Sequence, residues 1–178
     1  MKRIFLVLIL AAGTLIVGAQ GRSNLSVGID AAIPTYAMVG EMKGLLTGIY
    51  IKKDWGWGKY FAGTLNAGYQ YFKGTAKAFD DKEVENYAVV PLLAGLKGYV
   101  IKNTYLSFET GVNISAHKNS ATHMAFVPSI GTLIPVGTKQ IDLSIRYNAT
   151  KSGMTYPEAP PFRRGGFALL GIRIGLVL

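Results

Sequence analysis

The 178-residue chain contains no cysteine, only two histidines, and few charged residues for its length, 16% of the total. Without cysteine it forms neither the disulfides that staple small secreted domains nor a thiolate metal site. Beyond its N-terminal segment, no stretch reaches the ~18 uninterrupted apolar residues of a membrane-spanning helix. Nevertheless, 49% of the residues are hydrophobic. These features exclude a disulfide scaffold and a helical membrane protein, and they leave an apolar chain that needs another explanation.

The N-terminal segment, MKRIFLVLILAAGTLIVGAQG, has the layout of a secretory signal peptide. Lys2 and Arg3 precede an apolar run, which small residues follow at Val17 and Ala19. We expect residues 1–19 to be removed, which lowers the formal net charge from +9 to +7. An uncleaved membrane anchor is the alternative interpretation.

Eight later segments alternate apolar side chains with polar or small ones, the pattern of a β-strand with two unlike faces. The connections after the second, fourth and sixth segments are short, whereas the other connections are mostly longer and more polar. Short turns at one end and long loops at the other are typical of an outer-membrane barrel with both termini in the periplasm. We predict an all-β fold over residues 20–178, an eight-stranded antiparallel up-and-down transmembrane β-barrel. The expected strands are 24–33, 44–53, 59–72, 87–100, 104–116, 123–134, 140–150 and 166–178.

Glycines indicate which face of these strands lies inside. The non-aliphatic face carries eight glycines, although a solvent-facing strand surface has no need of glycine. The lumen of an eight-stranded barrel is just wide enough for side chains, so small residues are needed opposite large ones. A lipocalin-like soluble barrel with the opposite facing is the alternative. We expect three acids and three bases to pair inside, with both arginines engaging carboxylates, in a lumenal network of Asp30, Lys97, Glu109, Asp142, Arg146 and Arg173.

The last segment carries an outward stripe of apolar residues, at Leu170, Ile172, Ile174, Leu176 and Leu178. Together with the signal peptide and the eight alternating segments, this stripe resembles the small eight-stranded outer-membrane β-barrel families. The segments VVPLLAGLKGYV and GIRIGLVL are similar to the outer-membrane β-barrel proteins common in Bacteroidota. The resemblance implies that the barrel-insertion machinery reads the stripe as an insertion signal. An aromatic residue usually ends that strand in such families, whereas this chain ends on leucine.

Aromatic residues flank two of the short turns, Trp55 and Trp57 at the first and Tyr99 and Tyr105 at the second. Such amphipathic rings favour the lipid headgroup level, so the four residues are predicted to form an aromatic girdle. Ordinary turn packing is the alternative.

Candidates for chemistry are few. Ser115, His117 and His123 lie in or near one long loop, but the His-any residue-Ser order of lipid A deacylases is absent, which favours solvated loop histidines. The acidic run FDDKEVEN offers oxygen ligands for Ca²⁺, but its spacing does not match an EF-hand, so a solvated loop is favoured. We therefore expect no catalytic residues, no metal site and no cofactor.

The expected function is that of a non-catalytic outer-membrane barrel with a plugged lumen, acting in a structural or interaction role through its loops or within a larger complex. A narrow channel for ions or small solutes is the first alternative, and a lipid-modifying barrel enzyme is the second. Expected partners are outer-membrane lipids, the barrel-insertion machinery and an unidentified envelope protein. Lipopolysaccharide phosphates would meet Lys151, Arg163 and Arg164. Nucleic acid is excluded by export and by the scattered charge.

Overall fold

The computed structural model describes residues 23–37, 41–77, 83–84, 87–116, 122–152 and 167–178, and almost all of them lie in β-strands. The signal-peptide prediction and most of the loop predictions concern residues outside these ranges. In the described part of the chain, no helix is long and apolar enough to span a membrane. The strands are β1 (Asn24–Ala37), β2 (Glu41–Trp57), β3 (Phe61–Lys77), β4 (Glu83–Val84), β5 (Tyr87–Ile101), β6 (Thr104–Ser115), β7 (His123–Val136), β8 (Lys139–Ser152) and β9 (Phe167–Val177).

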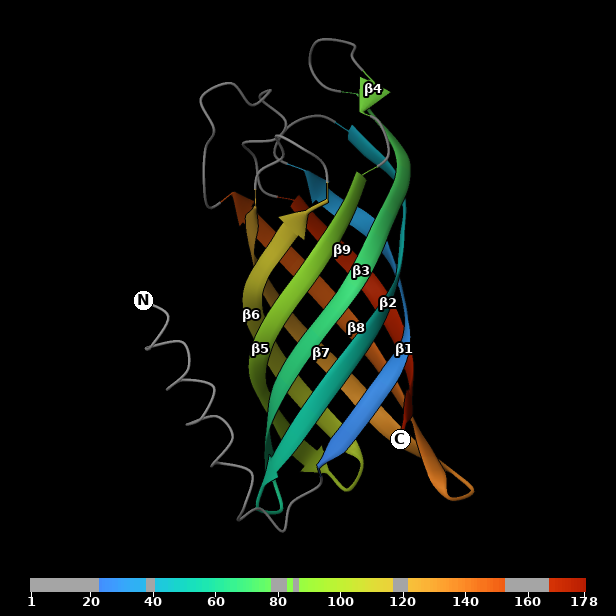
Figure 1. Cartoon of the computed structure of the whole chain (residues 1–178), viewed down its shortest axis with the longest axis vertical. Helices are drawn as coiled ribbons and strands as arrows, with labels where there is room; N and C mark the ends of the chain where they lie inside the picture. The colour runs from blue at the N-terminus through green and yellow to red at the C-terminus, as the bar shows by residue number, and fades with distance from the viewer. Residues whose placement is uncertain (1–22, 38–40, 78–82, 85–86, 117–121, 153–166) are drawn as a thin grey trace.

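Eight of these strands close into an antiparallel barrel (Figure 1). Each strand pairs with its neighbours in the chain, and β1 pairs with β9 to close the cylinder. The two-residue β4 only extends the outer end of β3, where Ala76 pairs with Val84. The prediction of an eight-stranded barrel is therefore confirmed. Because closure leaves no unpaired barrel edge, the backbone polar groups of the wall find partners within the wall.

The two ends of the barrel differ in their connections. At one end, the turn end, tight turns join β2 to β3, β5 to β6 and β7 to β8. Gly58 and Gly137 occupy two of these turns with φ of +72° and +59°, the left-handed region that favours glycine. The C-terminus and the start of β1 also lie at the turn end (Figure 1). The opposite end, the loop end, carries the other four connections, three of which are longer than the tight turns.

Most of the observed strands extend the predicted ones, and β2 does so at both ends, whereas β6 and β9 are slightly shorter than predicted. Strand β2 continues to Trp57, so residues 54–57, expected to belong to the connection between the second and third strands, are strand. The pairing of Trp57 with Phe61 leaves only three residues between the two strands. This extension adds Asp54 to the inner face of the barrel, where it is 1% exposed.

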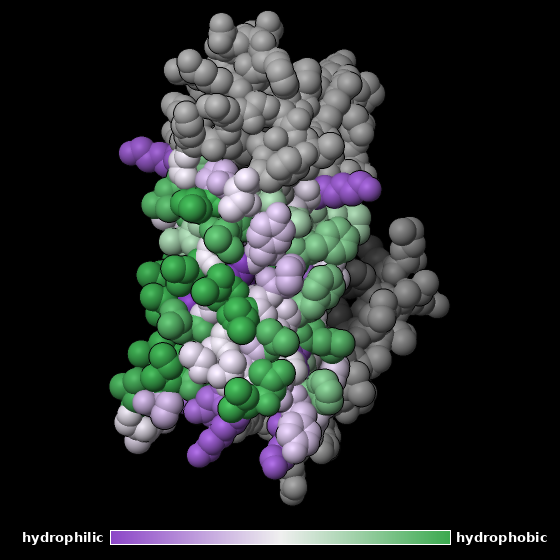
Figure 2. Space-filling model, turned by 180° about the vertical axis from the view of Figure 1, so that it is seen from behind, coloured by the Kyte–Doolittle hydropathy of each residue, from purple (hydrophilic) through white to green (hydrophobic). Residues whose placement is uncertain are grey.

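The outer face of the wall is apolar. Ile29, Ile49, Leu96 and Ile172, which lie on four different strands, are between 53% and 63% exposed. Figure 2 shows hydrophobic side chains over the middle of the wall and hydrophilic ones near its two ends. An exposed apolar wall of this kind is unfavourable in water but suits a hydrocarbon surrounding.

Buried apolar clusters accompany the charged side chains inside the barrel. One, towards the turn end, is formed by Ala62, Tyr99, Tyr105, Leu133 and Val177. Another, towards the loop end, is formed by Leu46, Phe72 and Leu169, with Ala32 against it. A third is formed by Leu93, Ala125 and Val127. Because these apolar side chains offer no polar partners, the buried charged side chains must satisfy one another.

Candidate functional site

Among the described side chains, eight charged ones lie inside the barrel, four acidic and four basic, and each is at most 8% exposed. They form two groups, each with two positive and two negative charges. The central cluster holds Asp30, Glu109, Arg146 and Arg173. The turn-side cluster holds Lys52, Asp54, Lys97 and Asp142. Exact neutrality within each cluster is what a low-dielectric lumen requires, because an uncompensated buried charge costs several kcal/mol.

In the central cluster, the guanidinium group of Arg173 donates two hydrogen bonds to the carboxylate of Asp30. Its Nε lies 2.6 Å from one carboxylate oxygen of Asp30 and an Nη lies 2.9 Å from the other. The amide of Gln70 donates a third hydrogen bond of 3.0 Å to the same carboxylate. A bidentate, charge-assisted pair of this type is among the strongest polar contacts in proteins.

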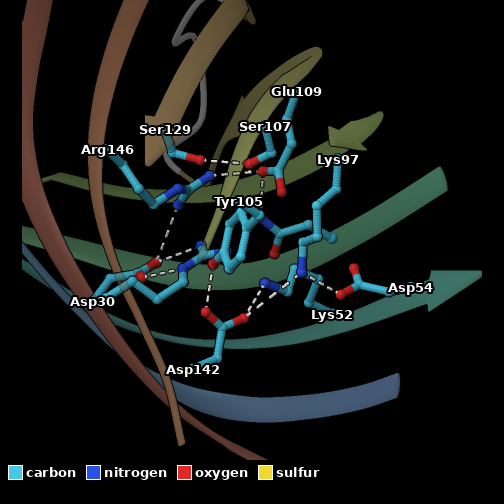
Figure 3. Close-up of polar contacts among 12 residues, drawn as sticks. Asp30, Lys52, Asp54, Lys97, Tyr105, Ser107, Glu109, Ser129, Asp142 and Arg146 are labelled. Carbon is cyan, nitrogen blue, oxygen red and sulfur yellow. Dashed lines mark hydrogen bonds and ion pairs between the residues drawn. The ribbon is translucent and has the colours of Figure 1, made fainter. Parts of the chain in front are cut away.

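Arg146 connects this pair to Glu109. One of its terminal nitrogens donates a 2.8 Å hydrogen bond to Glu109 Oε2, while the other lies 3.8 Å from Asp30. Asn66 also donates to Glu109, over 3.0 Å. Arg146 therefore lies between two carboxylates and bridges strands on opposite sides of the lumen, as Figure 3 shows.

The turn-side cluster is organised around Asp142. Lys52 lies 2.5 Å from one of its carboxylate oxygens, and the hydroxyl of Tyr105 donates to the other. Lys97 donates to Asp54 and lies 4.0 Å from Asp142. Like Arg146, Lys97 thus stands between two carboxylates (Figure 3).

Two tyrosine rings add a second type of contact to the cations. The guanidinium carbon of Arg173 lies 3.8 Å from the ring centroid of Tyr50, and Lys97 Nζ lies 4.1 Å from that of Tyr105. Both distances are typical of cation–π attraction. Glycine makes room for these rings, because a Cβ at Gly175 would collide with the Tyr50 hydroxyl and one at Gly131 with the Tyr105 hydroxyl.

All six residues predicted for the lumenal network lie inside the barrel in contact with opposite charges. The two members that sequence reasoning missed are Lys52 and Asp54. Lys52 shares its face with Gly48, so strand parity alone could have found it. Asp54 could not be assigned to the inner face from the sequence, because the expected second strand ends at residue 53.

The predicted aromatic girdle is wrong for Tyr99 and Tyr105. Tyr105 is 1% exposed and Tyr99 9% exposed, and their rings meet inside the barrel with centroids 6.1 Å apart. The physical reason is strand parity, since Tyr99 shares the inner face of β5 with Lys97. Trp57, in contrast, is 49% exposed, and Trp55 lies on the same outward face of β2.

The apolar stripe of the last strand faces outward. Its five members, Leu170, Ile172, Ile174, Leu176 and Leu178, are between 38% and 60% exposed. Among the residues noted for other chemistry, Lys151 is exposed at the end of β8 and His123 begins β7. His117, Arg163, Arg164 and most of the acidic run lie outside the described residues.

The fold and the lumen together place the protein in one structural class. It is a closed eight-stranded antiparallel barrel with an apolar outer wall and an interior of paired charges. Among solved structures, the chain is similar to the outer membrane protein OprG from Pseudomonas aeruginosa, with a TM-score of 0.56 and 12% sequence identity. The match covers 88% of this chain and 95% of that one. At this identity the similarity concerns the fold alone. No family model matches the chain, and no curated protein matches it.

Proposed function

We propose that the chain is an integral outer-membrane β-barrel with both termini on the periplasmic side, and that its role is structural or interactive rather than catalytic. Its apolar wall would face lipid, and its loops would be presented outside the cell to an envelope partner. The proposal retains the resemblance to the Bacteroidota-type barrels, and it assigns the outward stripe of β9 to recognition by the insertion machinery. The TM-score of 0.56 to an outer-membrane barrel supports this placement.

The observation that carries the plugged-lumen part of the proposal is the network that crosses the barrel. The Arg173–Asp30 and Arg146–Glu109 contacts span the middle of the lumen, and buried apolar clusters lie towards both ends. Ions entering this space would need to displace paired charges without gaining the hydration of a water-filled pore. We therefore expect no steady conduction.

Planar-bilayer recording of the purified, full-length protein tests this expectation. Insertion should first be established by heat-modifiable migration and by protection of the wall from protease. Inserted protein should then show no stable current. Ohmic, long-lived channels would contradict the plugged lumen and would favour the second candidate function.

That second candidate is a narrow channel opened by exchange of ion-pair partners. Arg146 and Lys97 each lie within 4.0 Å of two carboxylates, so each can change partner by a small movement. A small cavity of about 20 Å³, enough for one water, also adjoins Asp30, Gln70, Arg146 and Asn148. Rare, brief openings that respond to voltage would support this candidate.

A further inference from the structure

The charges on the outside of the barrel are distributed very differently from those inside. All four carboxylates whose side chains the structure describes, Asp30, Asp54, Glu109 and Asp142, are buried in the lumen. The described side chains that carry charge on the outer surface are lysines, and they lie near the two ends of the wall. The part of the outer surface that the structure describes therefore carries a positive charge that the neutral lumen does not cancel.

Each tight turn contributes to this potential. Lys59 lies in the β2–β3 turn, Lys102 in the β5–β6 turn, and Lys139 directly after the β7–β8 turn, and all three are exposed. Lys53 joins them, partly exposed, on the outward face of β2. We call these four residues the basic rim.

Exposed aromatic side chains accompany the basic rim. Trp57, Tyr60 and Phe61 are 49%, 57% and 62% exposed around the β2–β3 turn, and Lys59 Nζ lies 5.4 Å from the Tyr60 ring centroid. Aromatic rings of this kind concentrate at the headgroup level of a bilayer. Lysines interleaved with such rings are therefore placed where lipid phosphates lie, which distinguishes the rim from a patch that faces open solvent.

We propose that the basic rim binds the headgroups of anionic phospholipids in the leaflet at the turn end of the barrel. This inference rests on the proposed membrane placement and goes further by naming the lipid class. An ammonium group attracts a phosphate as a point charge at the membrane surface, and one lysine there is worth roughly fivefold in binding. The rim would select anionic lipids as neighbours and would fix the depth of the turn end in the membrane.

The two tryptophans of the chain, Trp55 and Trp57, provide a local probe because both lie beside Lys53 and Lys59 at the turn end. The full-length protein is reconstituted in phosphatidylcholine vesicles that contain increasing fractions of phosphatidylglycerol. One lipid at a time carries brominated acyl chains, which quench neighbouring tryptophan fluorescence. The ratio of the two quenching curves gives the association constant of phosphatidylglycerol relative to phosphatidylcholine near these two residues.

We expect the relative association constant to lie between about fivefold and about 25-fold in favour of phosphatidylglycerol, the effect of one or of both lysines beside the tryptophans. It should fall to about one in the Lys53→Gln/Lys59→Gln variant, and also in ~1 M salt, where the Debye length shrinks to ~3 Å. The matched control is Lys73→Gln/Lys151→Gln, which removes two exposed lysines at the loop end and should leave the ratio unchanged.

Equal quenching by the two lipids in the unmodified protein would overturn the inference, as would a ratio that persists in the Lys53→Gln/Lys59→Gln variant. Either result would direct attention to an acidic protein as the partner of the rim. If brominated phosphatidylcholine itself fails to quench the tryptophans, the protein is not inserted. In that case the proposed membrane placement fails as well, so the two failures are distinguishable.

Discussion

Arg173 and Asp30 face each other directly across the seam at which the last strand closes on the first. Their two hydrogen bonds therefore connect the first strand to the last strand and also pair two opposite charges. A shift of this seam by one residue would move Arg173 to the outer wall and leave Asp30 buried without its partner. The pair thus stabilises one register of closure over its neighbours.

Breaking this pair from either side should strongly destabilise the barrel. Arg173→Gln leaves the carboxylate buried, and Asp30→Asn leaves the guanidinium buried, so each should lower the free energy of unfolding by ~3–5 kcal/mol. The double variant should lose less than the sum, by a coupling energy of ~0.5–3 kcal/mol. Urea unfolding in lipid vesicles measures all three variants. Lys73→Gln, outside the lumen, is the control that should change little, and strict additivity would contradict direct coupling.

The close approach of Gly131 to Tyr105 leads to a second prediction. A Cβ at position 131 would lie 2.5 Å from the ring carbon that bears the hydroxyl and 2.8 Å from the carbonyl oxygen of Leu143. The ring is held by its hydrogen bond to Asp142, so it cannot move without loss. Gly131→Ala should therefore destabilise the barrel by ~1–3 kcal/mol, the usual effect of overpacking.

Gly98→Ala is the matched control, because a Cβ there meets only the Phe61 ring at 3.7 Å, an ordinary contact. Its unfolding midpoint should stay close to that of the unmodified protein. Adding Tyr105→Phe to Gly131→Ala should recover part of the lost stability, since it removes the atom nearest to the new methyl group. Equal midpoints for the two alanine variants would show that the lumen relaxes around position 131.

Single-cysteine substitutions along β8 test which face of the barrel wall contacts lipid. Ile145 and Tyr147 are 52% and 41% exposed, whereas Ser144, Arg146 and Asn148 are buried. Because the chain has no cysteine, single cysteines at these positions and at the outward Leu143 report facing without interference. A lipid-phase thiol reagent should label positions 143, 145 and 147 and spare 144, 146 and 148. Ile145→Arg should cost ~2–4 kcal/mol if the residue lies near the bilayer centre, and labelling of the even positions would favour a soluble barrel.

The alternation of side chains between the two faces of each strand explains which features of the fold and the lumen could be predicted from the sequence. Alternation with a period of two identified the barrel, its eight wall strands and the six charged residues of the expected network, because each signal is local to one strand. Many partners in the network depend on contacts across the lumen, such as that of Lys52 with Asp142, two residues that lie 90 positions apart in the chain. No local pattern encodes those contacts. Tyr99 and Tyr105 were misplaced because turn proximity was given more weight than parity.

Glu109 is the most direct test of whether the network plugs the lumen. Its carboxylate accepts hydrogen bonds from Arg146 and Asn66, so Glu109→Ala removes the nearest partner of a buried cation and opens space beside it. We expect a loss of ~3–5 kcal/mol in unfolding free energy and brief current steps in planar bilayers. Ser107→Ala, on the same face of β6, removes only a neutral contact with Ser129 and should cost ~1 kcal/mol without current. If Glu109→Ala had the same unfolding free energy as Ser107→Ala and also showed no current, charge pairing at this position would not be what keeps the lumen closed.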